Sequence, residues 1–123
     1  MKNINKDNLE NFMAYYQNFH DSTITSIDYD ILNSKMTLYI NVFWGGDTTT
    51  NKDGSLNTHK SRIKILFEDV YKCNNKELFL WDSIYDAYLK YIHLDNQEYL
   101  CFADDEKTPS IYIVCKSMKY EVL

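Results

Sequence analysis

The sequence contains few of the residues that break or cross-link a chain. Its 123 residues include one proline, three glycines and three cysteines. An odd cysteine count without C-x-x-C spacing does not favour a disulfide framework, and zinc sites need closely paired ligands. Cys73, Cys101 and Cys115 lie within apolar runs. We therefore expect buried, reduced thiols in a cytoplasmic protein.

Long hydrophobic runs and an excess of basic charge are also absent. No apolar stretch approaches the ~18 residues of a membrane span. The polar start Met1–Lys6 is not followed by an apolar segment, so we expect no signal peptide. The 13 Lys and Arg against 18 Asp and Glu give a net charge of -5. This balance disfavours nucleic-acid binding, because such proteins neutralise phosphates with clustered Lys and Arg.

The remaining composition is that of a folded protein. Hydrophobic residues make up 45% and charged residues 25% of the chain, which predicts one domain over residues 1–123. Twelve lysines accompany a single arginine, Arg62, and tyrosine occurs 11 times. Because codons rich in A and T favour these residues, we expect a bacterial source.

The first segment, Asp7–Phe19, has the period of a helix. Leu9, Phe12, Met13 and Tyr16 recur at spacings of three and four, so one apolar stripe can face a core. Asp7 stands at the expected N-cap position, with Glu10 three residues later, as in a capping box.

From Thr23 onward the period changes to two, which is typical of strands. Ile27, Tyr29 and Ile31 alternate with polar residues, and a second alternating run follows the turn residues Asn33-Ser34. The second run consists of Met36, Leu38, Ile40 and Val42. Two such runs around a short turn predict an antiparallel hairpin.

The remaining chain predicts more strands around one long connection. All three glycines lie between Trp44 and Thr58, a polar connection longer than usual and therefore mobile or functional. Asp53-Gly54 indicates a tight turn within it. Strands are expected at 62–67, with a continuation to Lys72 after a bend, and at 99–103, 110–115 and 119–123.

The segment Trp81–Leu94 fits two periods. Ile84, Tyr88 and Ile92 fit a helix that begins with a Ser83-x-x-Asp86 capping box, whereas alternation and aromatic content favour a strand. Periodicity alone does not decide between them. The predicted fold is thus α+β: an N-terminal helix packed on a bent, mainly antiparallel β-sheet of about six to eight strands. The expected core combines the helix stripe with Ile27, Leu38, Ile40, Ile65, Ile111 and Ile113.

Phe19-His20-Asp21-Ser22 contains three side chains that hydrolases use. A catalytic triad collects its members from distant positions. Neighbours along an extended chain point to opposite sides, so these three should not converge. The favoured interpretation is a helix-to-strand junction fixed by side-chain bonds to the backbone. Contact with a partner and catalysis by His20 with a distant carboxylate, Glu68 or Asp69, remain alternatives.

No metal or cofactor site is predicted. His59 and His93 belong to no His or Cys grouping. Thr49 and Lys60 occupy the positions where a calcium loop has its first Asp and its bidentate Glu. Gly45-Gly46 precedes neither a lysine with Ser or Thr nor a helix pattern, so a phosphate loop is not indicated.

Acidic side chains form the remaining candidate surface. Asp104, Asp105 and Glu106 are consecutive, and such a patch either keeps a protein soluble or steers a basic partner towards it. Trp44 and Tyr85 are candidates for self-association.

The run Phe19-His20-Asp21-Ser22-x-Ile24-x-x-Ile27 resembles a group of small, mostly uncharacterised bacterial proteins in which this element opens a strand. Leu38-x-Ile40-x-Val42, Ile65–Val70 and Ile111-x-Ile113-x-Cys115 extend the resemblance. Some proteins of the group are immunity proteins of bacterial polymorphic toxin systems, which occlude a cognate toxin. The resemblance implies an immunity role, and it favours a strand in the region after Trp81. No catalytic residues are established for the group, so none is assigned to this chain.

The sequence therefore predicts a non-enzymatic protein-binding module. Its candidate binding residues are His20, Asp21, Trp44, Asp104, Asp105 and Glu106. Its expected partner is a basic protein, such as a toxin. A small hydrolase or isomerase using His20 and a self-associating accessory domain, for example a homodimer, are the alternatives.

Overall fold

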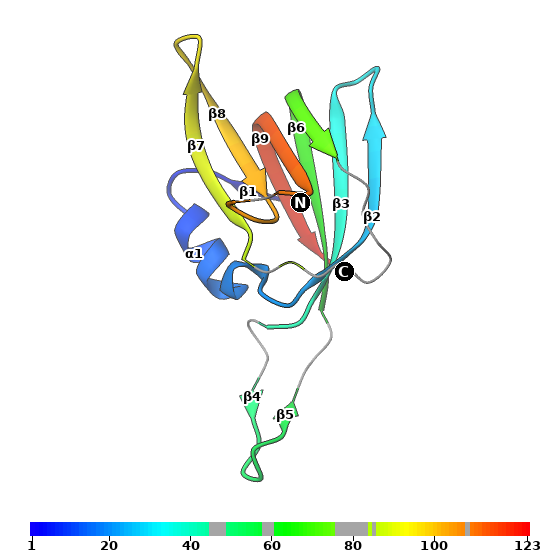
Figure 1. Ribbon diagram of the computed structural model, residues 1–123, viewed down its shortest axis with the longest axis vertical. Coiled ribbons are helices and arrows are strands. Elements are labelled where there is room, and N and C mark those ends of the chain that lie inside the picture. Colours follow the sequence, from blue (N-terminus) through cyan, green and yellow to red (C-terminus); the bar gives the residue numbers. More distant parts are fainter. Residues whose placement is uncertain (45–48, 58–60, 76–83, 85, 108) are drawn as a thin grey trace.

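The computed structural model describes residues 1–44, 49–57, 61–75, 84, 86–107 and 109–123 (Figure 1). Its elements, in chain order, are β1 (Lys2–Ile4), α1 (Leu9–Tyr15), the 3-10 turn η1 (Gln17–Phe19), β2 (Thr23–Asp30), β3 (Lys35–Val42), β4 (Thr49–Thr50), β5 (Leu56–Asn57), β6 (Ser61–Asn75), β7 (Tyr88–Leu94), β8 (Gln97–Ala103) and β9 (Ile111–Val122). The protein is mainly antiparallel sheet with one short helix, which confirms the α+β prediction in its broad form.

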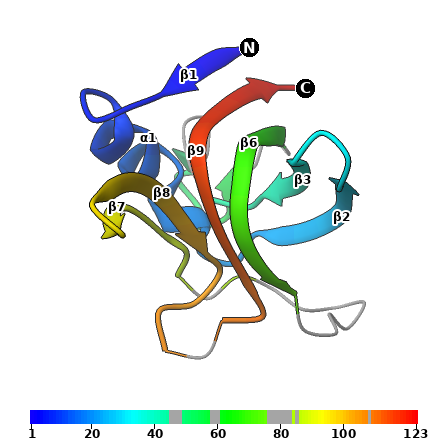
Figure 2. The same cartoon turned by 90° about the horizontal axis from the view of Figure 1, so that it is seen from above.

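One curved sheet dominates the fold. Its strand order is β2-β3-β6-β9-β8-β7, and β1 pairs with the C-terminal part of β9. Viewed from above, the sheet curls, with α1 beside the β7–β8 end (Figure 2). The short β4–β5 hairpin projects from the opposite end of the long axis to the β7–β8 turn (Figure 1). β2 and β7 are thus the two outer strands of the main sheet.

The predicted hairpin of β2 and β3 is confirmed, with pairing from Thr23↔Asn41 to Asp30↔Lys35. Asn33 donates from its backbone N–H and its amide to the carboxylate of Asp30, which closes the turn. The expected alternation of Ile27, Tyr29 and Ile31 does not extend to its end, because Ile31 lies in the turn and is 72% exposed.

The helix is confirmed but is shorter than predicted, and the predicted N-cap residue, Asp7, is wrong. α1 begins at Leu9 after the N-cap Asn8, instead of after Asp7. The Asn8 side chain makes no capping bond; its Oδ1 accepts from the Asn5 N–H at 2.8 Å, which holds the turn after β1. Beyond α1 the chain takes positive φ values at Gln17, Asn18 and Phe19, so the helix does not reach Phe19.

The two longest strands, β6 and β9, pair along most of their length, from Ile63↔Val122 to Asn75↔Ile111. The bend expected after Phe67 is present as a register shift between Val70 and Lys72. The separate strands predicted at 110–115 and 119–123 are wrong. They are one strand, because β6 pairs with β9 from Ile111 to Val122, and β1 pairs with its other edge at Met118–Tyr120.

The core lies between α1, η1 and one face of the sheet. Phe12, Met13, Tyr16 and Phe19 pack in one cluster with sheet residues of β3, β6, β8 and β9. The predicted core residues of the sheet are fully buried except Ile27, which is partly buried on the outer strand, and Leu9 of the helix is also partly buried. Each buried aliphatic side chain stabilises the fold by about 1.5–3 kcal/mol.

A second apolar cluster covers the other face of β8 and β9. Cys101 and Val114 are fully buried there, flanked by Tyr88, Tyr99 and Tyr112. β8 is therefore buried on both faces from Tyr99 to Ala103, which explains why its sequence does not alternate. Cys101 and Cys115 are buried free thiols, as predicted, whereas Cys73 is only partly buried.

The ambiguous segment Trp81–Leu94 and the long connection Trp44–Thr58 are partly described. Residues 88–94 form β7, as favoured, and Ile84, Asp86 and Ala87 are in neither helix nor strand; residues 81–83 and Tyr85 lie outside the described part. The described part of the Trp44–Thr58 connection contains β4, β5 and the predicted tight turn at Gly54, whose φ is +86°. No helix among the described residues is long and apolar enough to cross a membrane.

Candidate functional site

The junction between η1 and β2 is built by backbone hydrogen bonds to the segment before β7. Asp21 N–H donates to Ile84 O at 2.9 Å, Ile84 N–H to Ser22 O at 2.7 Å, and Ala87 N–H to Asn18 O at 2.9 Å. These three backbone hydrogen bonds hold Asn18, Asp21 and Ser22 against Ile84 and Ala87. The structural interpretation of the His20-Asp21-Ser22 motif therefore has a direct physical basis.

Ser22 has a structural position. Its side chain is completely buried, and its Oγ accepts the Phe43 N–H at 3.1 Å. The hydroxyl thus joins the chain just before β2 to the chain just after β3, beyond the last register pair of the two strands, Thr23↔Asn41. A buried hydroxyl engaged in this way is a poor nucleophile, since a nucleophile needs a base within hydrogen-bond reach.

His20 and Asp21 converge, whereas the buried Ser22 points away towards Phe43, so the three side chains do not all meet. His20 Nε2 lies 3.5 Å from Asp21 Oδ2, and Trp44 Nε1–H donates to the same oxygen at 2.9 Å. The chain is not extended here: Asp21 has a φ of +61°, which turns its carboxylate back towards the histidine. Three of the predicted site residues therefore form one cluster.

The second neighbour of His20 is a residue that the sequence analysis did not select. His20 Nδ1 lies 3.4 Å from Asp86 Oδ1, so both ring nitrogens face carboxylates. The three side chains are between 38% and 54% exposed. Asp86 is far from His20 in sequence, and the one local pattern that includes it, the Ser83-x-x-Asp86 capping box, gives no sign that it lies next to His20.

The other predicted acidic residues, Asp104 to Glu106, lie in the β8–β9 connection. Asp104 Oδ1 accepts the N–H groups of Ser110 and Ile111 at 2.9 and 3.0 Å. Asp104 therefore fixes this connection through one of its two carboxylate oxygens. Asp105 accepts the Lys107 N–H at 3.1 Å, and the Glu106 side chain is exposed.

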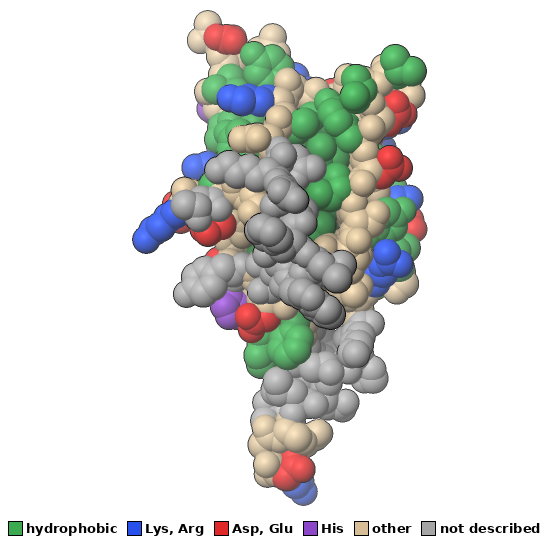
Figure 3. Space-filling view, turned by 45° about the vertical axis from the view of Figure 1, so that its right-hand side comes forward, with side chains coloured by type: hydrophobic (Ala, Val, Ile, Leu, Met, Phe, Trp, Pro, Cys, Tyr) green, Lys and Arg blue, Asp and Glu red, His purple; other side chains and the backbone are tan. Residues whose placement is uncertain are grey.

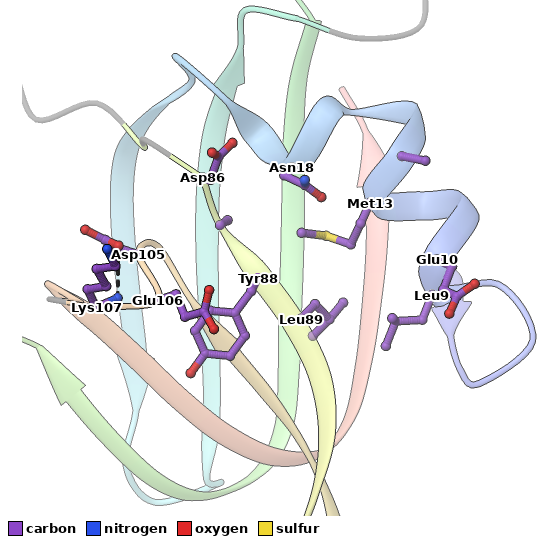
Figure 4. A pocket seen from close by; sticks show the side chains of 12 residues that line it. Leu9, Glu10, Met13, Asn18, Asp86, Tyr88, Leu89, Asp105, Glu106 and Lys107 are labelled. Atoms are coloured by element: carbon purple, nitrogen blue, oxygen red, sulfur yellow. Dashed lines mark hydrogen bonds between the residues drawn. The ribbon is translucent and has the colours of Figure 1, made fainter.

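A groove of about 690 Å³ connects these two acidic regions (Figure 4). Leu9 and Glu10 of α1 lie on one side, Asp105, Glu106 and Lys107 on the other, and Tyr88 and Leu89 of β7 between them. The remaining lining residues are Met13, Ala14, Asn18, Asp86 and Ala87. We call this cavity the acidic groove.

The charges around the acidic groove are unbalanced. Four carboxylates, those of Glu10, Asp86, Asp105 and Glu106, line it, and Lys107 is the one cationic side chain among its described lining residues. Burial, with nearby Cys101 as a lesser cause, raises the pKa of the Tyr88 phenol to about 12. Tyr88 is therefore a neutral side chain at neutral pH, and the groove combines an apolar floor with acidic walls.

Acidic residues elsewhere are differently arranged. A second groove of about 420 Å³, on another side of α1, is lined by tyrosines and has no carboxylate among its described lining residues. Elsewhere on the surface, acidic and basic side chains alternate along the right-hand margin of the face in Figure 3. The acidic groove thus differs from both of these surfaces in its concentration of carboxylates.

The proposed catalytic pairings of His20 are not those of the structure. Glu68 forms an ion pair with Lys119 at 3.0 Å, and Asp69, which lies within β6, has a φ of +52°. The carboxylates next to His20 are Asp21 and Asp86. Among the described residues, no group of three His, Cys, Asp or Glu side chains is arranged to hold a metal ion.

No protein-family model matches the chain, and no curated protein is significantly similar to it in sequence. The resemblance to bacterial immunity proteins therefore stays a prediction. Tyr85, a candidate for self-association, lies outside the described residues, and Trp44 is a hydrogen-bond donor to Asp21.

Proposed function

We propose that the protein is a non-enzymatic binding module that takes a basic segment of another protein into the acidic groove. The observation that carries this proposal is the set of four carboxylates against one lysine around an apolar floor. Charge complementarity of this kind accelerates association and selects the partner. The overall charge of -5 acts in the same direction.

The arrangement of His20 supports binding over catalysis. A general base needs a ring nitrogen that reaches the proton it abstracts. Both nitrogens of His20 instead face carboxylates, and the buried Ser22 hydroxyl accepts a backbone N–H. In this proposal the cluster positions Asp86 at the rim of the acidic groove and has no chemical step to perform.

The first experiment measures binding of a fluorescent peptide of alternating lysine and threonine to the full chain, with a glutamate–threonine peptide as control. We expect the lysine peptide to bind and the glutamate peptide not to bind. Added salt should weaken binding, because ions screen exposed charges. Equal binding of both peptides, or of neither, contradicts the proposal.

A pair of charge-matched variants locates the site. Glu10→Lys/Glu106→Lys reverses two groove carboxylates, and Asp28→Lys/Glu121→Lys makes the same change in net charge outside the described groove lining. We expect the groove variant to lose about tenfold or more in affinity and the control less than about threefold. Similar losses in both variants would mean that net charge, and not the acidic groove, attracts the peptide.

The immunity-type role is the narrower form of this proposal, and it derives from the motif resemblance. It requires that the basic partner be a toxin whose gene lies beside that of this protein. Co-purification of a neighbouring toxin in a defined ratio would support it. A self-associating domain would instead show a larger sedimentation coefficient at higher protein concentration.

A further inference from the structure

The turn between β7 and β8 determines which backbone groups of β7 face outward. Asp95 and Asn96 both have positive φ values, +49° and +63°, as in a type I′ two-residue hairpin. The residues that flank such a turn, Leu94 and Gln97, exchange both of their hydrogen bonds. The bonded pairs of an antiparallel ladder then recur at every second residue.

This alternation leaves one half of the β7 backbone directed away from β8. Residues 88, 90, 92 and 94 direct their backbone N–H and C=O groups towards β8, whereas Leu89, Tyr91 and His93 turn theirs outward. In the described part of the chain, the outward N–H and C=O groups of these three residues have no backbone hydrogen-bond partner. β7 is the last strand in the order of the sheet (Figure 1).

Ala87, two residues before Leu89, shows that this edge can bind a backbone partner. Ala87 N–H points the same way as Leu89, and it donates to Asn18 O at 2.9 Å. Asn18 therefore occupies the first place along the edge. An added segment would continue the pairing from Leu89 towards His93.

The acidic groove meets this edge. Leu89 and Tyr88 belong both to β7 and to the groove lining. Successive side chains of a strand point to opposite sides of the sheet. A basic segment paired with Leu89 would thus direct alternate side chains towards the carboxylates of Glu10 on one side and Glu106 on the other.

We propose that the outer edge of β7 binds the basic segment of the partner as an added β-strand, with its lysine or arginine side chains in the acidic groove. This inference rests on the proposed function and specifies its geometry. Main-chain bonds supply affinity in such complexes, and the adjacent side-chain sites supply selectivity.

The test compares the lysine–threonine peptide with a twin in which each backbone nitrogen is methylated. Methylation removes every backbone donor and keeps every charge. We expect the twin to bind about tenfold or more weakly. Equal affinity of the two peptides would overturn strand addition and leave the charge-based function intact. If neither peptide binds, the proposed function itself is contradicted, and the inference with it.

A pair of variants tests the same point on the protein. His93 is largely exposed, and its N–H faces outward. His93→Pro removes that N–H, and His93→Ala removes the imidazole alone; proline is tolerated on strand edges that face solvent. We expect the Pro variant to bind at least about threefold more weakly than the Ala variant. Equal binding by two variants with unchanged melting temperatures would contradict the proposal.

Discussion

The two outer strands of the sheet, β2 and β7, have opposite characters. β2 has a register shift between Ile24 and Ser26, where Thr25 Oγ1 donates to Tyr39 O at 3.2 Å. β7 pairs with β8 without any register shift over all its residues. Bulges and charges protect sheet edges from pairing with other chains. The regular β7 edge is therefore the one suited to receive a strand.

Both outer strands depend on the same junction. Ser22 anchors the start of β2 through the Phe43 N–H, and Asn18 anchors the approach to β7 through Ala87. The residues 18–22 thus hold the two ends of the sheet in position. The His20-Asp21-Ser22 motif serves the fold at one end of the sheet and the rim of the acidic groove at the other.

The largest expected effect comes from the strand that supports β2. Leu38 is fully buried on β3, opposite Ile27 of β2 and Ile65 of β6. Leu38→Asp buries an unpaired charge, so we expect little folded protein in circular dichroism. Ile31→Asp, at an exposed position of the same hairpin, is the control and should melt near the parent temperature. A Leu38→Asp protein that melts within a few degrees of the parent would show that the face is assigned wrongly.

A smaller loss of stability is expected at the junction. Ser22→Ala leaves the Phe43 N–H without its partner, which should lower the free energy of unfolding by about 1–2 kcal/mol. Ser26→Ala, at an exposed position of β2, should change it by less than about 0.5 kcal/mol. Chemical denaturation measures both values. Equal losses would mean that Ser22 does not anchor β2 in the way described.

The smallest effect concerns tyrosines on the two outer strands. Burial raises the pKa of Tyr88 on β7 to about 12, and partial burial beside Cys73 raises the pKa of Tyr29 on β2. Both folded-state pKa values exceed the ordinary value of 10.0. The stability from each neutral phenol is therefore present below pH 10 and is lost as the pH rises through the folded-state pKa.

An alkaline titration followed by tyrosinate absorbance tests this difference. Tyr88→Phe should remove a phenol that ionises near pH 12, since its folded-state pKa is raised to about that value. Tyr29→Phe should remove one that ionises above its ordinary pKa. If Tyr88→Phe removes a phenol that ionises at or below pH 10, the burial assigned to the Tyr88 phenol is wrong.

Local periodicity predicts most of the fold. The stripe through Phe12 and Met13 and the alternation through Leu38 and Ile40 indicate the helix and the hairpin, because each pattern reports a buried face. The double burial of β8 hides its alternation, and the continuous β9 depends on pairing with β6 and β1. Pairing with strands distant in sequence cannot be read from the local pattern of Lys116 and Ser117, which lie between the two predicted strands.

The candidate site is harder to predict from the sequence than the fold. The motif identifies His20 and Asp21, but Asp86 joins them only because backbone bonds to Ile84 and Ala87 bring its segment to the junction. Glu10 and Glu106 face one groove because α1 and the β8–β9 connection lie on either side of β7. These residues are distant in sequence, and no spacing rule relates them.

Amide hydrogen exchange with and without the lysine–threonine peptide tests the central claim most directly. The account predicts that the peptide slows exchange at the outward N–H groups of Leu89, Tyr91 and His93 and leaves the β2 amides unchanged. Slower exchange along β2, or no change along β7 at a saturating peptide concentration, would contradict it.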